Sequence, residues 1–186
     1  MLAIIPARKG SKRLPNKNIM PLLGKPLIQY TLYAANYANC IDRTIISTDI
    51  TDITGMKLDG EYTLLMRQKK LCGDDIPIIM VIKHILNWVE ERPRAVILLQ
   101  PTSPLRTSHD IDEAAELSGN VLSVCEVCPN IYKRNGAIYI MRTEDIMENN
   151  VQFNSLYVMP KEKSIDIDTK EDFEEAERLM RERNRL

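Results

Sequence analysis

The residues with the clearest chemical potential form a basic loop near the N-terminus. An apolar run at 2–6 is followed by the segment 7–18, which carries five cationic side chains and a single glycine. Backbone N–H groups can turn inward in such a loop, while Arg8, Lys12 and Lys17 neutralise phosphate oxygens. The sequence lacks the Gly-x-x-x-x-Gly-Lys-Ser/Thr spacing of a P-loop. The loop therefore indicates a polyphosphate cradle of another type, with a basic surface turn as the alternative.

A second candidate lies near the C-terminus, where Asp166 and Asp168 flank Ile167. Alternate side chains of an extended strand share a face, so both carboxylates would point one way while Ile167 packs into the core. Two hard oxygen ligands suit Mg²⁺, which commonly uses one or two carboxylates together with substrate phosphates. The alternative is a solvated strand end that leads into a helix cap. A cationic phosphate loop in the same sheet favours the metal interpretation.

The chain offers no convincing protein nucleophile. His84 falls within an expected helix and His109 follows a turn, and neither has an evident Ser or Cys partner. Cys125 and Cys128 have the spacing of half a zinc site, but no second Cys or His pair completes it, so reduced packing residues are expected. Phosphoryl or nucleotidyl transfer fits best, because positioning, cations and metal supply most of the catalysis in those reactions.

Apolar strands that alternate with helical patterns must position these groups. Their continuous apolar character predicts an α/β fold, a mostly parallel sheet with helices on both faces. Ligands bind beyond the carboxyl ends of such strands, where the basic loop, Ser47, Arg67 and Gln100 fall. The expected strands are 2–6, 44–47, 62–66, 95–99, 121–127, 137–141 and 155–159, with an extended segment at 164–168, and the expected helices are 27–38, 77–91 and two that begin at the capping pairs Thr107/Asp110 and Thr169/Asp172.

Length and charge narrow the class of protein. The chain of 186 residues suits one domain, 1–186, and its net charge of −1 argues against a nucleic-acid partner. No apolar run approaches the ~20 residues of a membrane span. The start lacks the order of a signal peptide, since its apolar run precedes the basic residues. We therefore expect a cytoplasmic protein without nucleic-acid or membrane partners.

Six segments together resemble those of one known family, the acylneuraminate cytidylyltransferases (CMP-sialic acid synthetases). They occur in the family's order and span nearly the whole chain, and the set is highly specific although each member alone is weak. The matching segments are residues 5–18, 47–49, Arg67, 99–106, 134–139 and 164–169.

The resemblance implies a Rossmann-like nucleotidyltransferase fold that activates a nine-carbon α-keto acid sugar with CTP, uses Mg²⁺ and releases pyrophosphate. The sugar's own anomeric hydroxyl would attack the α-phosphorus, which agrees with the missing nucleophile. Asp168 would also help to deprotonate that hydroxyl. The family pattern assigns Arg8, Lys17 and Asp168 to catalysis, Ser11, Lys12, Asn18, Ser47, Arg67, Gln100, Arg134 and Asn135 to substrate binding, and Asp166 and Asp168 to the metal.

Within the substrate-binding set, the resemblance divides the residues between nucleotide and sugar. Asn18 and Arg67 would contact the cytidine, whereas Gln100, Arg134 and Asn135 would face the sugar and its carboxylate. The implied partners are therefore CTP and an acidic keto-sugar.

The chain departs from the family pattern mainly in a long insert that normally precedes Arg134. In the family this arm packs on a partner subunit and helps to enclose the sugar, but here only residues 128–133 remain, so a homodimer is left open. Gln68 replaces a usual proline, and Ile78 stands where a polar ligand residue is common. Two alternatives stay open: a cytidylyltransferase for another keto-sugar acid or sugar phosphate, and a non-catalytic CTP-binding module.

Overall fold

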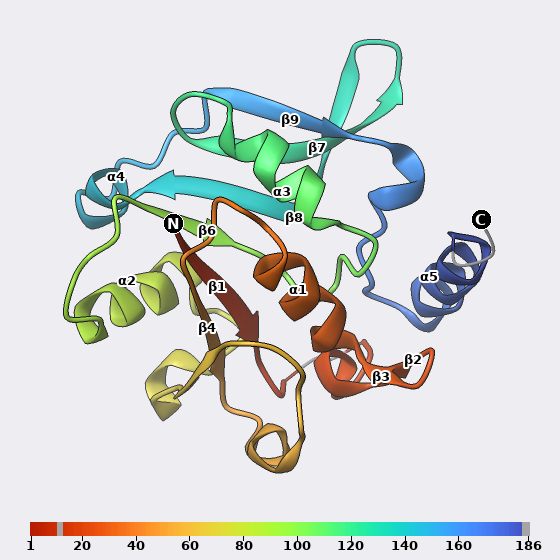
Figure 1. Cartoon of the computed structure of the whole chain (residues 1–186), viewed down its shortest axis with the longest axis horizontal. Coiled ribbons are helices and arrows are strands. Elements are labelled where there is room, and N and C mark those ends of the chain that lie inside the picture. Colours follow the sequence, from red (N-terminus) through yellow and green to blue (C-terminus); the bar gives the residue numbers. More distant parts are fainter. Residues whose placement is uncertain (11–12, 184–186) are drawn as a thin grey trace.

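The computed structural model describes residues 1–10 and 13–183, and its centre is a seven-stranded sheet (Figure 1). The strand order is β5-β4-β1-β6-β8-β7-β9. Neighbours among the first four strands are parallel, β8 is antiparallel to both of its neighbours, and β9 is parallel to β7. The strands are β1 (Leu2–Ala7), β4 (Arg43–Thr48), β5 (Thr63–Met66), β6 (Ala95–Leu98), β7 (Val121–Cys128), β8 (Ile131–Arg142) and β9 (Ser155–Met159), with a separate hairpin of β2 (Pro21–Leu22) and β3 (Lys25–Pro26). The predicted mostly parallel α/β sheet is confirmed.

Helices cover both faces of this sheet, which explains why its interior strand β1 is apolar throughout. Ala3 and Ile5 of β1 pack with α1 and α3, whereas Leu2 and Ile4 pack with α2 and α4. None of the helices in the described part of the chain is long and apolar enough to cross a membrane. The helices are α1 (Leu27–Asn36), α2 (Ile78–Trp88), α3 (Ser108–Ala115), α4 (Thr143–Met147) and α5 (Lys170–Arg183), with 3₁₀ turns η1 (Lys17–Ile19), η2 (Thr51–Gly55), η3 (Lys69–Leu71) and η4 (Lys161–Lys163).

The C-terminal helix α5 forms a smaller cluster beside the β2–β3 hairpin. Ala176 and Met180 of α5 are buried there with Leu22, Leu27 and Ile167. The helix begins after Thr169, whose hydroxyl accepts from the backbone N–H of Asp172 while that carboxylate accepts from the N–H of Thr169. The reciprocal cap at Thr107 and Asp110 is formed in the same way. Both predicted capping pairs are confirmed.

The segment 164–168, expected to be extended, forms no strand of the sheet, because it pairs with no neighbouring strand. The predicted alternation of side chains, with Ile167 in the core between two outward carboxylates, is nevertheless present. Ile167 is fully buried, and its N–H donates to the carbonyl of Thr102, so the apolar residue and one hydrogen bond anchor the segment. Asp166 and Asp168 both line one cavity as a result.

Strand β8 begins six residues before the predicted 137–141. Residues 128–133, which stand where the family arm would be, close a tight hairpin in which Cys128 lies opposite Ile131. Asn130 adopts a left-handed conformation, φ 62°, as short hairpin turns require. In place of an arm, a narrow hairpin tip protrudes from the body (Figure 1).

Candidate active site

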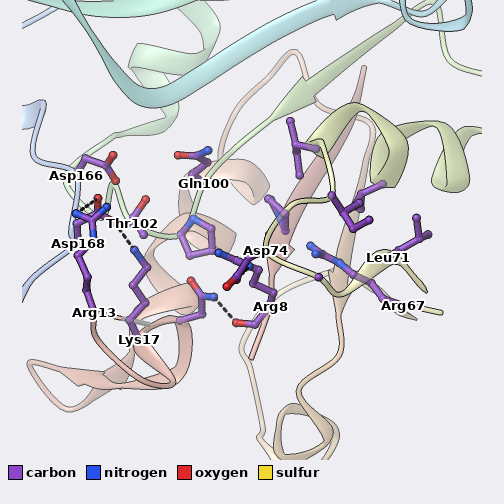
Figure 2. A pocket seen from close by; sticks show the side chains of 17 residues that line it. Arg8, Arg13, Lys17, Arg67, Leu71, Asp74, Gln100, Thr102, Asp166 and Asp168 are labelled. Carbon is purple, nitrogen blue, oxygen red and sulfur yellow. Dashed lines mark hydrogen bonds and ion pairs between the residues drawn. The ribbon is translucent and has the colours of Figure 1, made fainter. Parts of the chain in front are cut away.

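A cavity of about 520 Å³ opens at the carboxyl ends of β1, β5 and β6, and its lining side chains come from four separate parts of the chain, within 6–18, 67–81, 100–102 and 166–168 (Figure 2). These strand ends meet at one edge because the three strands run in the same direction. The predicted site residues that line the cavity are Arg8, Lys17, Asn18, Arg67, Gln100, Asp166 and Asp168, joined by Arg13, Asp74, Thr102 and an apolar group that includes Leu71, Ile76, Ile78 and Val81.

The basic loop and the carboxylate segment meet at one end of this cavity. Lys17 Nζ donates to the carbonyl oxygen of Ile167 at 2.7 Å and to Asp168 Oδ1 at 2.8 Å. The guanidinium of Arg13 lies 3.0 Å from Asp168 Oδ2. The hydrogen bond from Lys17 is the main reason that the pKa of Asp168 is lowered. Both cations are therefore paired with this carboxylate in the structure.

Asp166 experiences the opposite electrostatic environment. Desolvation by neighbouring protein atoms raises the pKa of this carboxylate, although the residue as a whole is exposed and a hydrogen bond with Thr102 partly offsets the shift. No group of three or more His, Cys, Asp or Glu side chains able to hold a metal occurs among residues 1–10 and 13–183. An oxygen-only pair fits Mg²⁺ that is held jointly by protein carboxylates and substrate phosphates. The donor set is therefore compatible with the predicted metal site.

Arg8, directly after β1, is oriented by two residues from other parts of the chain. Its guanidinium pairs with Asp74, and its carbonyl oxygen accepts from Asn18 Nδ2 at 3.0 Å. Asn18 is buried, so its amide fixes the backbone of the loop. Asp74 was not predicted from the sequence, although the Gly73-Asp74-Asp75 run is a visible turn signal.

Arg67 enters the cavity from the end of β5 and is held from behind by Ser47. Ser47 Oγ accepts from Arg67 Nε at 3.0 Å, and the Ser47 carbonyl accepts from a terminal nitrogen at 3.1 Å. Burial lowers the pKa of Arg67. Ser47 is fully buried and does not line the cavity, so the structure places it behind a candidate ligand residue.

Of the three residues expected to face the sugar, the structure places one in the cavity and two outside its lining. Gln100 lines the cavity, whereas Arg134 is exposed on the β7–β8 hairpin and Asn135 is buried beneath it. Neither of these two belongs to the cavity lining. Ser11 and Lys12, which were predicted to bind substrate, lie outside the described residues.

Arg106 is a structural residue of the site whose role sequence reasoning missed. It is almost fully buried and donates to the carbonyl oxygens of Ala137 at 2.6 Å and Gln100 at 3.3 Å, and to Thr31 Oγ1 at 2.7 Å. Desolvation lowers its pKa to about 9. Its position in the 99–106 motif was the available signal, but only the fold shows that it joins α1, the loop after β6 and β8.

Comparison with known proteins agrees with this geometry. A family model described as Cytidylyltransferase matches residues 2–123. The CMP-N,N'-diacetyllegionaminic acid synthase of Legionella pneumophila is 32% identical over 223 aligned residues, covering 97% of this chain and 96% of that protein. The N-acylneuraminate cytidylyltransferase of Escherichia coli O18:K1:H7 is 30% identical and covers 100% of this chain. The chain spans about half, 53%, of the length of that E. coli protein.

A solved structure shares the fold. The CMP:2-keto-3-deoxy-manno-octonic acid synthetase complexed with CTP superposes with a TM-score of 0.77 at 16% identity, over 98% of both chains. The family model covers more than half of this chain, and the Legionella relative matches it nearly end to end. The resemblance inferred from six sequence segments is confirmed: this chain belongs to the cytidylyltransferase family, alongside acylneuraminate members.

Proposed function

We propose that this chain transfers the CMP group of CTP to the anomeric hydroxyl of a sialic-acid-like nonulosonic acid, with Mg²⁺ as cofactor and pyrophosphate as the second product. One observation carries the proposal. The basic loop and the carboxylate pair, 151 positions apart at Lys17 and Asp168, meet in one cavity at the carboxyl edge of the sheet. A phosphate-neutralising loop beside hard oxygen ligands suits a metal-bound nucleoside triphosphate.

The reaction requires no covalent intermediate with the protein. The anomeric oxygen attacks the α-phosphorus, a new P–O bond forms, and the bond to the β-phosphate breaks to release pyrophosphate. Arg8 and Lys17 hold the triphosphate and neutralise the charge that develops during transfer. Asp168 takes the hydroxyl proton after Lys17 has turned from its carboxylate to the phosphates. Asp166 and Asp168 would hold Mg²⁺, which would supply Lewis-acid stabilisation on the order of several kcal/mol.

The acceptor class follows from the relatives' names. Their names specify diacetyllegionaminic acid, N-acylneuraminate and pseudaminic acid, all acidic nine-carbon sugars. Gln100 lines the cavity beside the carboxylates, where a sugar hydroxyl or carboxylate would lie. The first alternative is a cytidylyltransferase for another keto-sugar acid or a sugar phosphate, and a fold neighbour is named for an octonic acid. The second is a CTP-binding module without turnover.

The test is pyrophosphate release from CTP with Mg²⁺ and a panel of nonulosonic and octulosonic acids. ATP, GTP and UTP serve as nucleotide controls, EDTA tests the metal, and mass spectrometry identifies the CMP-sugar. CTP-specific release with a nonulosonic acid supports the proposal. Release only with an octulosonic acid favours the first alternative, and CTP binding without any release favours the second. Sedimentation of the same sample determines whether a homodimer forms with the short hairpin, and fractionation tests the expected cytoplasmic location.

A further inference from the structure

An irregularity in the β7–β8 pairing lies directly beside the carboxylate segment. Leu122 lies opposite Tyr139, but Val124 lies opposite Arg134, so the segment 135–138 faces Ser123 alone. Such a bulge bends its strand and redirects the side chains around it. The bulge contains Gly136, which has φ +74° and lies close to two residues of the cavity lining. A Cβ atom built on Gly136 would lie 2.7 Å from Gln100 Oε1 and 3.4 Å from Asp166 Oδ2.

Asn135 holds this bulge with the oxygen of its side-chain amide. Its Oδ1 accepts from Ser123 Oγ at 2.6 Å and from the N–H of Ala137 at 3.2 Å. Ser123 Oγ in turn accepts from the N–H of Ile138 at 2.8 Å. Only 4% of Asn135 is exposed. Its amide is therefore committed to the protein and presents almost no surface to a substrate.

The other end of the Asn135 amide reaches the carboxylate segment. Asn135 Nδ2 donates to Ser164 Oγ at 3.0 Å, and Ser164 precedes Asp166 by two residues. The Ser164 hydroxyl donates onward to the carbonyl of Pro160 at 2.8 Å. The residue before Ser164 is also fixed, because Lys163 Nζ lies 2.9 Å from the buried carboxylate of Asp110. The start of the 164–168 segment is thus fastened to β8 and α3.

We propose that Asn135 is a positioning residue, which acts through Ser164 and the bulge to hold Asp166 and Asp168 in place for the divalent cation. This assigns it a different role from the acceptor contact that the family pattern implies. The inference rests on the proposed function for its metal site. Residues that orient metal ligands typically change metal affinity or activity about 10- to 100-fold when removed. Sugar contacts would change the KM of the acceptor instead.

The test uses Mn²⁺ with CTP as the probe, titrated by electron paramagnetic resonance, together with steady-state kinetics. Asn135→Ala is expected to weaken Mn²⁺ binding about tenfold or more, while the acceptor KM at saturating metal stays near the wild-type value. Ser164→Ala is expected to weaken Mn²⁺ binding as well. The double variant should bind Mn²⁺ only slightly more weakly than Asn135→Ala alone, because both substitutions break the same Asn135–Ser164 hydrogen bond. Ser164→Ala also provides the test if Asn135→Ala fails to fold.

Asn120→Ala is the matched control. Asn120 is another buried amide, directly before β7, which is bonded to Asp145 and the carbonyl of Gln152 and does not line the cavity. It should lower thermal stability without changing Mn²⁺ affinity. Wild-type Mn²⁺ affinity in Asn135→Ala with a raised acceptor KM would overturn the inference, as would wild-type protein that binds no Mn²⁺ with CTP. Mn²⁺ binding that depends on Asn135 without any CMP-sugar formation would support the inference and reject the proposed function.

Discussion

Replacing Gly136 with alanine should have two effects that can be measured separately: a loss of stability from backbone strain, and a loss of activity from a displaced Gln100. Alanine in the left-handed region at φ +74° costs about 1–2 kcal/mol. The new methyl would also lie 2.7 Å from Gln100 Oε1, which must move. That atom ends a flexible side chain, so the amide should rotate away with little additional loss of stability. For a chain of this length each 1 kcal/mol lowers Tm by about 2–4 °C, so the expected decrease is about 2–8 °C.

Gly24→Ala is the control, because Gly24 has φ +81° with no atom within 4 Å of an ideal Cβ. Both variants should lose similar free energy of unfolding, within about 0.5 kcal/mol, since the strain is alike. Only Gly136→Ala should lose kcat/KM for the acceptor, by about tenfold or more, because Gln100 leaves its position and Asp166 is crowded. Calorimetry and pyrophosphate release measure the two quantities.

Two outcomes would refute this reasoning. Equal activity in the two glycine variants would mean that the contact between Gly136 and Gln100 does not shape the site. A stability loss in Gly136→Ala several kcal/mol beyond that of Gly24→Ala would mean that the backbone, and not the amide of Gln100, had to move.

Three further changes probe the metal pair, the buried arginine and the anchored segment. Asp168→Asn should lower pyrophosphate release by orders of magnitude with little change in Tm, because its side chain is 42% exposed; near-normal turnover would exclude it as a metal ligand. Arg106→Met should lower the free energy of unfolding by about 2–4 kcal/mol in urea titrations, because it leaves two backbone carbonyls without their donor. Burial alone would raise the pKa of Asp110, but hydrogen bonds from Thr107 and Lys163 outweigh it and lower the pKa below 3.8. The ionised Asp110 carboxylate therefore stabilises the fold above pH 3.8, and this contribution is lost as the pH falls through the lowered pKa. In urea titrations at a series of pH values, Asp110→Asn should make the free energy of unfolding fall less steeply below pH 3.8. An unchanged fall in that range would contradict this assignment.

Much of the architecture could be predicted from local patterns. Strand β1 is buried on both faces, so it had to be apolar at every position, and continuous apolar runs identify such strands. The capping pairs at Thr107 and Thr169 depend only on residues three positions apart. The alternation around Ile167 placed both carboxylates correctly even though no strand forms, because burying one apolar side chain is enough to orient its neighbours.

The arrangement within the site depends on contacts between distant segments. Arg8 and Asp74 are 66 positions apart, and their pairing follows from the parallel order of β1, β4 and β5. The bulge at Asn135 follows from the register of β7 against β8, which local sequence does not specify. The same dependence explains why Ser47 lies behind Arg67 and not in the cavity.

The sequence by itself therefore determined which residues are basic, acidic or buried, and at which edge of the sheet they would gather, because strand polarity and apolar periodicity are local properties. Only the tertiary structure decided which of them reach the cavity and which hold others in place. Those roles depend on hydrogen bonds such as Asn135 to Ser164, whose partners lie 29 positions apart and meet only when the sheet is complete.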